Sequence, residues 1–353
     1  MSDSSETIVF VLPRYEGGGA ERVVIKVACE LKRKGRHVLL VGLLEDAPCS
    51  HFGLPSVGLG ASRVAFATIP LLQLFRSLRP FAVVSTLKHV SAMVAWVHIL
   101  SGCSFRHVVR VANTYSRELR GFGKGKAALW SIMLRQVHRL AHRTICVSQG
   151  VQRDLQANFA ISGERCVYIP NPVDLDGLHA AAEQVANREM LRYGADKVIL
   201  SVGRLTPQKN YLCLIDAFDR LCRQIETNCI LVIIGEGAER ARLEAEIHQR
   251  DLANRVKLLG WVANPYPYYA AADVFALSSD FEGMPNVILE ALTFDLPVVS
   301  TDCESGPREI LTSSDLGILV PVGDAHALAS GLAQALDGVR IGRRPEHVRQ
   351  HYD

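Results

Sequence analysis

The chain has 353 residues, of which 48% are hydrophobic and 21% charged, so it is long and apolar enough to form two hydrophobic cores. Its nine cysteines are odd in number and include no Cys-x-x-Cys pair, which gives no support to a disulfide framework or a zinc site and is typical of a reducing compartment. The first residues lack the basic start and long apolar core of a secretory signal, and residues 90–103, the most apolar stretch further on, fall short of the roughly 20 residues that span a bilayer. We therefore expect a cytoplasmic protein with two domains and no transmembrane segment.

The formal net charge of +3 conceals an asymmetry between the two halves of the chain. Residues 1–170 contain 22 Lys+Arg and 10 Asp+Glu, a net charge of +12, whereas residues 171–353 contain 17 Lys+Arg and 26 Asp+Glu, a net charge of −9. The first half is therefore expected to face an anionic partner. Nucleic acid, anionic lipid and a phosphorylated acceptor each fit, because charge reports the sign of a partner and not its identity.

Short runs of β-branched and apolar residues alternate with segments of helical length along the whole chain. Such runs are typical of parallel strands that are buried on both faces. Five of them lie at residues 8–12, 38–44, 82–86, 107–111 and 144–148, and the pattern begins again at 198–203, 229–235, 256–261, 274–279 and 297–301. The two groups predict an α/β protein with two doubly wound halves.

The two groups of strands are separated by a segment in which Pro170 and Pro172 disfavour a helix and the acidic, turn-rich composition suits a connection. Open parallel sheets bind ligands beyond the carboxyl ends of their strands, so the loops that follow the strands are expected to line a cleft between the domains. The expected organisation is an N-terminal domain at 1–170, a linker at 171–185, a C-terminal domain at 186–336 and a short tail at 337–353.

A glycine loop, Gly17-Gly18-Gly19, follows the first strand and precedes a helix. Small residues there let backbone amides and a helix N-terminus approach a phosphate or a sugar hydroxyl closely. A dinucleotide-binding fingerprint would require a third small residue where Arg22 stands, so an oxidoreductase is the weaker enzyme hypothesis. A tight turn without a ligand is the other interpretation of this loop.

Two cations, Arg204 and Lys209, follow the predicted strand at 198–203. They are five residues apart, and Pro207 stiffens the loop between them, so both are able to converge on one diphosphate. Cations in a loop are more often simply solvated. The segment described next favours the phosphate-binding interpretation.

Two carboxylates, Glu282 and Glu290, lie eight residues apart in the segment that follows the strand at 274–279. Pro285 is well placed for the first turn of a helix. Glu282 is then able to accept hydrogen bonds from sugar hydroxyls, the amides of residues 283–287 to meet a phosphate, and Glu290 to hold ribose hydroxyls. One segment would thus contact three parts of a nucleotide sugar.

These features together resemble the retaining glycosyltransferases of family 4, over nearly the whole chain. That family has the GT-B fold, in which two Rossmann-like doubly wound domains face one another across an interdomain cleft. The motifs that carry the resemblance are the glycine loop, CVSQGVQRDL (146–155), YIPNPVD (168–174), SVGRLTPQKN (201–210), the Glu282/Glu290 pair and GILVPVGD (317–324).

The resemblance implies acceptor binding by the N-terminal domain at 1–170 and nucleotide-sugar binding by the C-terminal domain at 186–336. It places Gly18 or Gly19 beside donor and acceptor. Arg204 and Lys209 would bind the donor diphosphate, Glu290 the ribose and Glu282 the transferred sugar. Retention in such enzymes is explained by front-face attack, in which the leaving phosphate receives the acceptor proton, so neither a metal nor a cofactor is expected. The full donor-binding set is Gly18, Gly19, Arg204, Lys209, Trp261, Val262, Glu282, Gly283, Met284, Pro285, Asn286, Val287 and Glu290, and the acceptor-binding set is Gly17, Glu21, Arg110 and Asn113.

A catalytic histidine is one feature in which this chain departs from the family pattern. Many relatives place it in a stretch like RVANTYS (110–116), where this chain has Ala112. His89, after the strand at 82–86, is the alternative catalytic candidate, although a single histidine is more often structural.

The segment TDCESGPREI (301–310) resembles members of the family that transfer N-acetylhexosamines from UDP in cell-envelope and lipid-linked glycan assembly. The expected reaction is transfer of a hexose or N-acetylhexosamine from a UDP-linked donor to a lipid-linked or lipopolysaccharide-type acceptor. An epimerase of the same fold, acting on sugar nucleotides, and a catalytically idle nucleotide-sugar-binding protein remain as alternatives. A nucleic-acid partner is not expected, because no aromatic stacking platform or reading motif accompanies the basic residues.

Residues 124–143 predict an amphipathic helix with arginines on one side and apolar residues on another. It would fit either an anionic membrane surface or an ordinary domain core, and the expected localisation is at the inner face of the cell membrane. His138 and His142 on this helix lack a third ligand and are interpreted as surface residues.

Two further features concern metals and the end of the chain. Asp174-Leu175-Asp176 matches an acidic metal-binding triplet but does not follow a sheet strand, so no metal is expected. Relatives continue into a helix that returns to the first domain, and the tail at 337–353 is expected to be abbreviated or cut short there.

Overall fold

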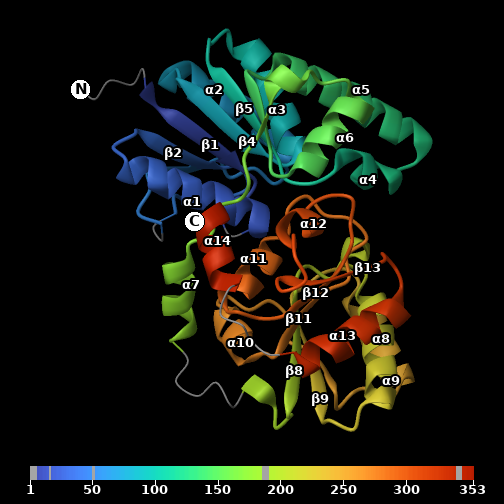
Figure 1. Cartoon of the computed structure of the whole chain (residues 1–353). Coiled ribbons are helices and arrows are strands. Elements are labelled where there is room, and N and C mark those ends of the chain that lie inside the picture. The colour runs from blue at the N-terminus through green and yellow to red at the C-terminus, as the bar shows by residue number, and fades with distance from the viewer. Residues whose placement is uncertain (1–5, 16, 50–51, 185–190, 339–343) are drawn as a thin grey trace. The chain divides into compact units, whose positions relative to one another are not determined.

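The structure is a computed structural model that describes residues 6–15, 17–49, 52–184, 191–338 and 344–353. The chain divides into two compact units, residues 1–170 and residues 171–353, and each is described by itself (Figure 1). Residue 185 of the expected linker, residues 186–190 of the expected C-terminal domain and residues 339–343 of the expected tail lie outside the described residues.

The first unit is built on a seven-stranded parallel sheet with the order β3-β2-β1-β4-β5-β6-β7. All five strands predicted in this half form, and the short strands β3 and β7 are added at the two edges. The strands are β1 Ile8–Leu12, β2 Val38–Gly42, β3 Ser56–Gly58, β4 Ala82–Thr86, β5 Arg106–Val111, β6 Arg143–Cys146 and β7 Cys166–Tyr168. The helices are α1 Gly19–Arg33, η2 Val64–Ala67, α2 Thr68–Leu78, α3 Lys88–Ser101, α4 Tyr115–Arg120, α5 Lys124–Leu140, α6 Gln149–Phe159 and η3 Gly163–Arg165.

Helices cover both faces of this sheet, as the alternation of side chains along β1 shows. Val9 and Val11 belong to a buried cluster with α2 and α3, whereas Phe10 and Leu12 belong to a second cluster with α1. Successive side chains of a strand point to opposite faces, so α1 lies on one face and α2 and α3 on the other. This explains why β1 is an unbroken apolar run.

The second unit contains a six-stranded parallel sheet with the order β10-β9-β8-β11-β12-β13. All six residues of β9 are buried, as expected for an inner strand with both faces covered. The strands are β8 Lys197–Val202, β9 Cys229–Ile234, β10 Val256–Leu258, β11 Val274–Leu277, β12 Val298–Thr301 and β13 Gly317–Val320. The helices are α7 Leu175–Ala182, η5 Pro207–Lys209, α8 Tyr211–Gln224, α9 Arg240–Gln249, α10 Tyr266–Ala271, α11 Asn286–Thr293, α12 Pro307–Ile310, α13 Ala325–Asp337 and α14 Arg344–Tyr352.

The two sheets share one strand order. In each, the first three strands are added one after another towards one edge of the sheet, and the fourth strand lies on the other side of the first, with the later strands continuing towards the opposite edge. This is the order of a Rossmann-like doubly wound sheet, whose switch point lies between the first and fourth strands. The switch points are therefore β1/β4 in the first unit and β8/β11 in the second. The predicted α/β class with two Rossmann-like halves is confirmed.

The segment expected to act as a linker contains helix α7, which packs on α10 and α11. Asp174 caps α7 by accepting a hydrogen bond from the Gly177 amide at 2.9 Å, and Asp176 forms an ion pair with Arg349 of α14. The two outer members of the acidic triplet 174–176 thus have structural partners. Helix α14 in turn packs on α11, and the Val173 amide donates to the Tyr352 carbonyl at 2.7 Å.

The amphipathic helix predicted at 124–143 forms as α5. Over the described part of the chain, no helix combines the length and the apolar character needed to cross a bilayer. The interpretation of His138 as a surface residue is wrong, because its side chain is fully buried, whereas His142 is exposed as expected. The error arises because the buried side of α5 extends beyond the apolar residues to include this ring.

Two buried histidines, His107 on β5 and His138 on α5, are held neutral inside the first unit. His107 Nε2 lies 2.9 Å from the Ser85 hydroxyl, and His138 Nδ1 lies 2.8 Å from the Thr144 hydroxyl. Burial lowers the pKa of His107 to about 3 and that of His138 to about 4. No carboxylate is hydrogen-bonded to either ring among the described residues, so a proton on either would be buried without compensation.

Replacing His107 by Gln is expected to weaken the pH dependence of stability below pH 6.5. An unfolded histidine has a pKa near 6.5 and takes up a proton that the folded His107 refuses, so acidification from pH 6.5 towards the folded pKa destabilises the native state by about 1.4 kcal/mol per pH unit. His107→Gln removes this slope while its amide can still bond Ser85. The measurement is the free energy of unfolding in urea at several pH values between pH 7 and pH 4.5, for wild type and His107→Gln.

The matched control is His37→Asn, which changes an exposed histidine of the same unit. It should leave the slope unchanged. Equal slopes for wild type, His107→Gln and His37→Asn would contradict a buried neutral His107.

Candidate functional site

The second unit gathers most of the candidate residues at the carboxyl edge of its sheet. The loops at 203–210, 278–285 and 302–306 follow β8, β11 and β12, which are neighbours in the sheet. Carboxyl ends of parallel strands meet at one edge, and a doubly wound sheet binds its ligands there, at the switch point. A ligand site is therefore expected at the loops after β8 and β11.

Lys209 and Glu282 form an ion pair between the loops after β8 and β11. Lys209 Nζ lies 2.6 Å from Glu282 Oε1, and the two side chains are only 14% and 9% exposed. The Ser279 hydroxyl donates to the same carboxylate oxygen at 2.7 Å. A carboxylate buried to this degree needs such partners, because an unpaired buried charge is strongly destabilising.

Two residues at and just after the end of β12, the strand next to β11, fix the backbone at Ser279. The Thr301 hydroxyl donates to the Ser279 carbonyl at 2.6 Å, and the Cys303 thiol donates to the same carbonyl at 3.1 Å. Both side chains are buried, and burial raises the pKa of the Cys303 thiol to about 12, so it remains protonated. Ser279 is thus fixed from two sides, and its hydroxyl is directed at Glu282.

Backbone contacts join the same two loops into one body. The Ser278 hydroxyl donates to the Lys209 carbonyl at 2.8 Å, and the Gln208 side-chain amide donates to the Phe281 carbonyl at 2.8 Å. The Asp280 amide also donates to the Gln208 carbonyl at 2.8 Å. These bonds hold the Lys209 backbone in place relative to Glu282.

Arg204 stands at the start of the loop after β8 and is exposed. Its backbone is held by close packing against the loop after β9: a Cβ at Gly235, which has a φ of +147°, would lie 1.9 Å from the Gly203 carbonyl oxygen. Only glycine fits there. Within the described residues the Arg204 guanidinium makes no ion pair, so its charge is available to a ligand in a way that the paired Lys209 charge is not.

Helix α11 begins at this edge, directly after the Glu282 loop, as Pro285 predicts. Its N-cap residue, Pro285, has no side-chain acceptor for the amides of the first turn, which are oriented for an anion. Gly306, with a φ of +92°, lets the loop after β12 approach, because a Cβ there would lie 2.8 Å from the Gly283 carbonyl oxygen. The Ser305 hydroxyl donates to that oxygen at 3.1 Å.

Residues 284 and 286 are held from the start of the second unit. The Asn171 side-chain amide donates to Asn286 Oδ1 at 2.6 Å, and the Asn171 backbone amide lies 3.3 Å from the Met284 sulfur. Asn171 belongs to the motif at 168–174 and is buried. The motif thus positions the N-terminus of α11.

Glu290 lies on the second turn of α11 and accepts a hydrogen bond from the Tyr269 hydroxyl at 2.8 Å. Tyr269 is fully buried between Phe275 and Phe294, with ring centroids 5.6 and 5.9 Å away. Burial, and then the charge of Glu290, raise the pKa of Tyr269 well above its usual value. The phenol therefore remains a donor that orients Glu290.

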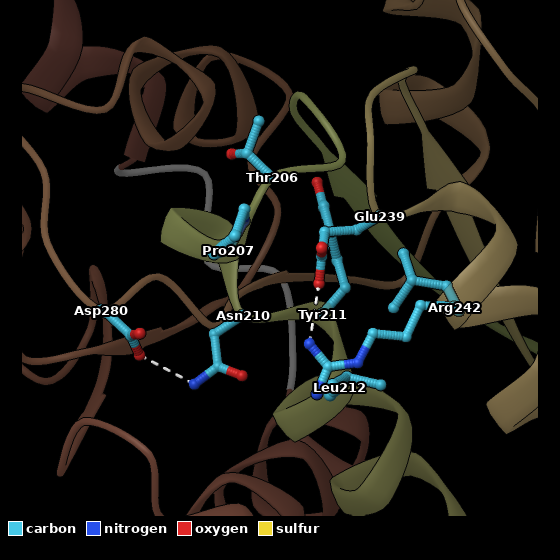
Figure 2. Close-up of a pocket in the computed structure, with 9 residues that line it drawn as sticks. Thr206, Pro207, Asn210, Tyr211, Leu212, Glu239, Arg242 and Asp280 are labelled. Carbon is cyan, nitrogen blue, oxygen red and sulfur yellow. Dashed lines mark hydrogen bonds and ion pairs between the residues drawn. The ribbon is translucent and has the colours of Figure 1, made fainter. Parts of the chain in front are cut away.

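A separate hollow of about 170 Å³ lies beside the loop after β8 (Figure 2). Asp280 accepts a hydrogen bond from the Asn210 side chain at 2.8 Å, and Arg242 pairs with Glu239 at 3.1 Å. Two carboxylates and one already paired cation are unsuited to a diphosphate. We therefore do not place the donor there.

Trp261 and Val262 lie further along the sheet edge. They follow Gly260, which forms a bridge with Gly235, and Trp261 is exposed. The structure brings Lys209 and Glu282 together, directly before residues 283–287.

The first unit carries a second cluster at its own switch point. Glu21 of α1 is buried beneath the glycine loop, where a Cβ at Gly17 would lie 2.7 Å from its carboxyl carbon. Arg110 at the end of β5 is also buried and donates to the Thr86 hydroxyl at 3.3 Å. Burial lowers the pKa of Arg110 to about 10, and the Glu21 carboxylate opposes that shift, so Arg110 is charged at neutral pH.

His89 lies in the first turn of α3, one residue beyond Lys88. It is exposed, yet the protein atoms around its ring and the Lys88 charge lower its pKa, while Glu21 acts in the opposite direction. The preceding Leu87 has a φ of +66°, a strained conformation for a branched residue, at the β4–α3 junction.

The remaining candidates of the first unit lie on other elements. Gly18 and Gly19 begin α1, and Asn113 accepts a hydrogen bond from the Thr114 amide.

Comparison with known proteins covers nearly all of the chain. A model of the group 1 glycosyl transferases matches residues 184–347, and a model of glycosyltransferase family 4 matches residues 17–176. The chain belongs to the family 4 glycosyltransferases. It is 40% identical over 195 residues to the N-acetylgalactosamine-N,N'-diacetylbacillosaminyl-diphospho-undecaprenol 4-alpha-N-acetylgalactosaminyltransferase of Campylobacter jejuni, and this match covers 55% of the chain and 50% of that relative.

A second relative and a solved structure match over greater lengths. The GDP-mannose-dependent alpha-mannosyltransferase of Mycobacterium tuberculosis is 26% identical over 95% of the chain and 86% of its own length. The structure of Anabaena HepE in complex with UDP-glucose superimposes with a TM-score of 0.81 at 21% identity, covering 98% of this chain and 95% of that one. The fold of this family 4 glycosyltransferase is therefore GT-B, as the resemblance implied.

The sequence analysis did not identify the residues whose hydrogen bonds position the predicted site residues. Ser279 and Thr301 end or directly follow two strands that were themselves predicted, and that position was the available signal. Cys303 lies in the segment 301–310, in which the resemblance places residues 304–306, and not Cys303, near the transferred sugar. Nothing in the sequence near Tyr269 indicates that it bonds Glu290.

Replacing Tyr269 by Phe is expected to lower the free energy of unfolding by about 1.5 to 3 kcal/mol, because a buried hydrogen bond to a charged group is lost. The measurement is a double-mutant cycle of Tyr269→Phe and Glu290→Gln in urea. We expect the two effects to be non-additive by at least about 0.5 kcal/mol, as for residues in direct contact. Additive effects would contradict the bond.

Proposed function

We propose that this chain is a retaining glycosyltransferase that moves a hexose or N-acetylhexosamine from a UDP-linked donor to a lipid-linked or lipopolysaccharide-type acceptor in cell-envelope polysaccharide synthesis. The observation that carries the proposal is the buried Lys209–Glu282 pair beside the exposed Arg204, at the switch point of the second unit. Two cations and a fixed carboxylate there match a diphosphate and a sugar.

In the proposed mechanism the second unit binds the donor without a metal or a cofactor. Arg204 and Lys209 neutralise the diphosphate, the first-turn amides of α11 meet a phosphate oxygen, and Glu290, oriented by Tyr269, holds the ribose. Glu282 accepts hydrogen bonds from hydroxyls of the transferred sugar. These groups are preorganised, so charge that develops on the leaving diphosphate meets cations that are already in place.

The acceptor side is proposed to be the first unit. Gly17, Glu21, Arg110 and Asn113 are the candidates for acceptor contacts, and His89 is the candidate histidine beside the reacting sugar. The acceptor hydroxyl attacks the anomeric carbon from the face that the diphosphate leaves. The bond from the anomeric carbon to the diphosphate oxygen breaks as the new glycosidic bond forms on the same face, so the anomeric configuration is retained. The acceptor proton passes to a phosphate oxygen of the leaving diphosphate.

The names of the similar proteins support the substrate classes. The Campylobacter jejuni relative is named for transfer of N-acetylgalactosamine to a diphospho-undecaprenol-linked acceptor, and HepE was solved with UDP-glucose. The Mycobacterium tuberculosis relative is named for GDP-mannose, so a guanine donor belongs in any test. The basic first half supports a place at the inner face of the cell membrane.

Replacing Arg204 by Ala is expected to lower kcat/KM for glycosyl transfer by about 100-fold or more, because the leaving diphosphate loses a charge-assisted partner. Purified protein is incubated with labelled UDP-GlcNAc, UDP-GalNAc, UDP-Glc or GDP-Man and lipid extract from the source cell, and label in the lipid phase is counted. Transfer from one donor would support the proposal.

The matched control is Arg220→Ala, which removes an exposed arginine of α8 that pairs only locally with Asp216. It should leave transfer unchanged. A donor that is bound but never transferred would indicate an idle binding protein, and a donor that is epimerised without an acceptor would indicate an epimerase. Either result would contradict the proposal.

A further inference from the structure

Acidic residues are nearly absent from one long segment of the first unit. Residues 47–153 contain 14 Lys+Arg and a single acidic residue, Glu118. That carboxylate forms an ion pair with Lys88. Helices α2, α3 and α5 lie in this segment and carry no acidic residue, so the surface that they form is cationic. Their basic residues are Arg76, Lys88, Lys124, Lys126, Arg135 and Arg139.

The same helices expose large apolar side chains. Trp96, Ile99 and Leu100 of α3 are 57%, 55% and 53% exposed, and their spacing of three and four residues places them on one side of the helix. Leu129 and Ile132 of α5 are exposed with the same spacing, as are Phe66 and Ile69 of η2 and α2. The exposed apolar residues thus follow helical stripes.

The three stripes belong to neighbouring helices. α3 packs against both α2 and α5, and it lies between them (Figure 1). Arg76 of α2 donates to the Leu100 carbonyl at the end of α3 at 3.0 Å, which fixes the two helix ends side by side. We call this surface, formed by the exposed residues of η2, α2, α3 and α5, the helical face.

A shallow hollow of about 580 Å³ lies where these three helices end. It is lined by Arg79, directly after α2, by Arg106, after the end of α3, and by Leu140 and His142 at the end of α5. The Arg106 guanidinium lies over the Phe81 ring, 4.7 Å from its centroid. No ion pair joins Arg79, Arg106 or His142 to a carboxylate in the described part of the chain, so the hollow suits an anion.

We propose that the helical face docks on an anionic lipid bilayer, with Trp96, Ile99 and Leu100 entering the headgroup boundary and the hollow of Arg79 and Arg106 receiving a lipid phosphate. Apolar residues with tryptophan at their centre and basic residues around them are the composition of an interfacial surface. The proposal deepens the proposed function, on which it rests for a lipid-linked acceptor, by naming the membrane-facing residues.

Other occupants fit the helical face less well. A second copy of the chain would bring two cationic surfaces together, which is unfavourable. Nucleic acid would use the basic residues but has no place for the aliphatic Ile99, Leu100 and Ile132. An anionic bilayer satisfies both the charge and the apolar stripes.

Vesicle flotation without any sugar donor tests the proposal. The chain is expected to float with vesicles of equal parts phosphatidylcholine and phosphatidylglycerol, and to bind vesicles of phosphatidylcholine alone at least about tenfold more weakly. Trp96→Ser with Ile99→Ser should lower the affinity for the anionic vesicles by about tenfold or more. Arg79→Gln with Arg106→Gln should lower it by about 25-fold, at roughly fivefold for each basic residue.

Two matched controls separate the helical face from general charge and hydrophobicity. Arg33→Gln with Arg36→Gln removes the same charge from exposed residues outside the segment 47–153, and Val322→Ser removes an exposed apolar residue of the second unit. Both should bind within about twofold of wild type, because bilayer attraction falls off within a Debye length of the surface. Losses equal to those of the helical-face variants would overturn the proposal.

Fluorescence locates the insertion directly. Of the three tryptophans, Trp130→Phe and Trp261→Phe leave only Trp96, whose emission should shift to shorter wavelength on anionic vesicles. An unshifted emission, or a dimer that Trp96→Ser dissociates in sedimentation, would overturn the docking surface. The vesicle assays contain no sugar donor, so they are independent of the transfer assay. Glycosyl transfer without docking would show that the docking proposal is wrong, and docking without transfer would show that the proposed function is wrong.

Discussion

The buried ion pair between Lys209 and Glu282 is the constraint on which the second unit depends. Its partners come from loops that are 73 residues apart in the chain, and Ser279 donates to the same carboxylate. Neither charge is tolerable at this depth without the other. The loops after β8 and β11 must therefore close on each other at the switch point of the sheet, and that closure sets the position from which Arg204 and the start of α11 meet a ligand.

The two units have one strand order but opposite charge and different polar interiors. In the second, the polar groups at the carboxyl edge form a connected network in which Ser279 is held by Thr301 and Cys303. In the first, Glu21 is buried beneath a glycine loop, and Arg110 is buried beside Thr86. The same architecture thus presents a buried ion pair and an exposed arginine on one sheet, and a buried acid and a buried base on the other.

The sequence predicted the inner strands and the main loops because those features are local. Buried parallel strands read as apolar runs, and Pro285 marks the start of α11 in the chain itself. The short edge strands β3 and β7 have too few residues for a periodic signal, and His138 was misplaced because one polar residue can face a core. Partners such as Tyr269 and Glu290 meet through the topology of the fold, so no local pattern indicates them.

The binding of UDP, UMP and uridine by calorimetry tests the central claim that Arg204 and Lys209 hold a diphosphate while Glu290 holds the ribose. We expect UDP to bind most tightly, and Arg204→Gln to weaken UDP by about tenfold or more while leaving uridine unchanged. Glu290→Gln should weaken all three ligands. Equal affinities for UDP and uridine, or a UDP affinity that Arg204→Gln does not alter, would contradict the claim.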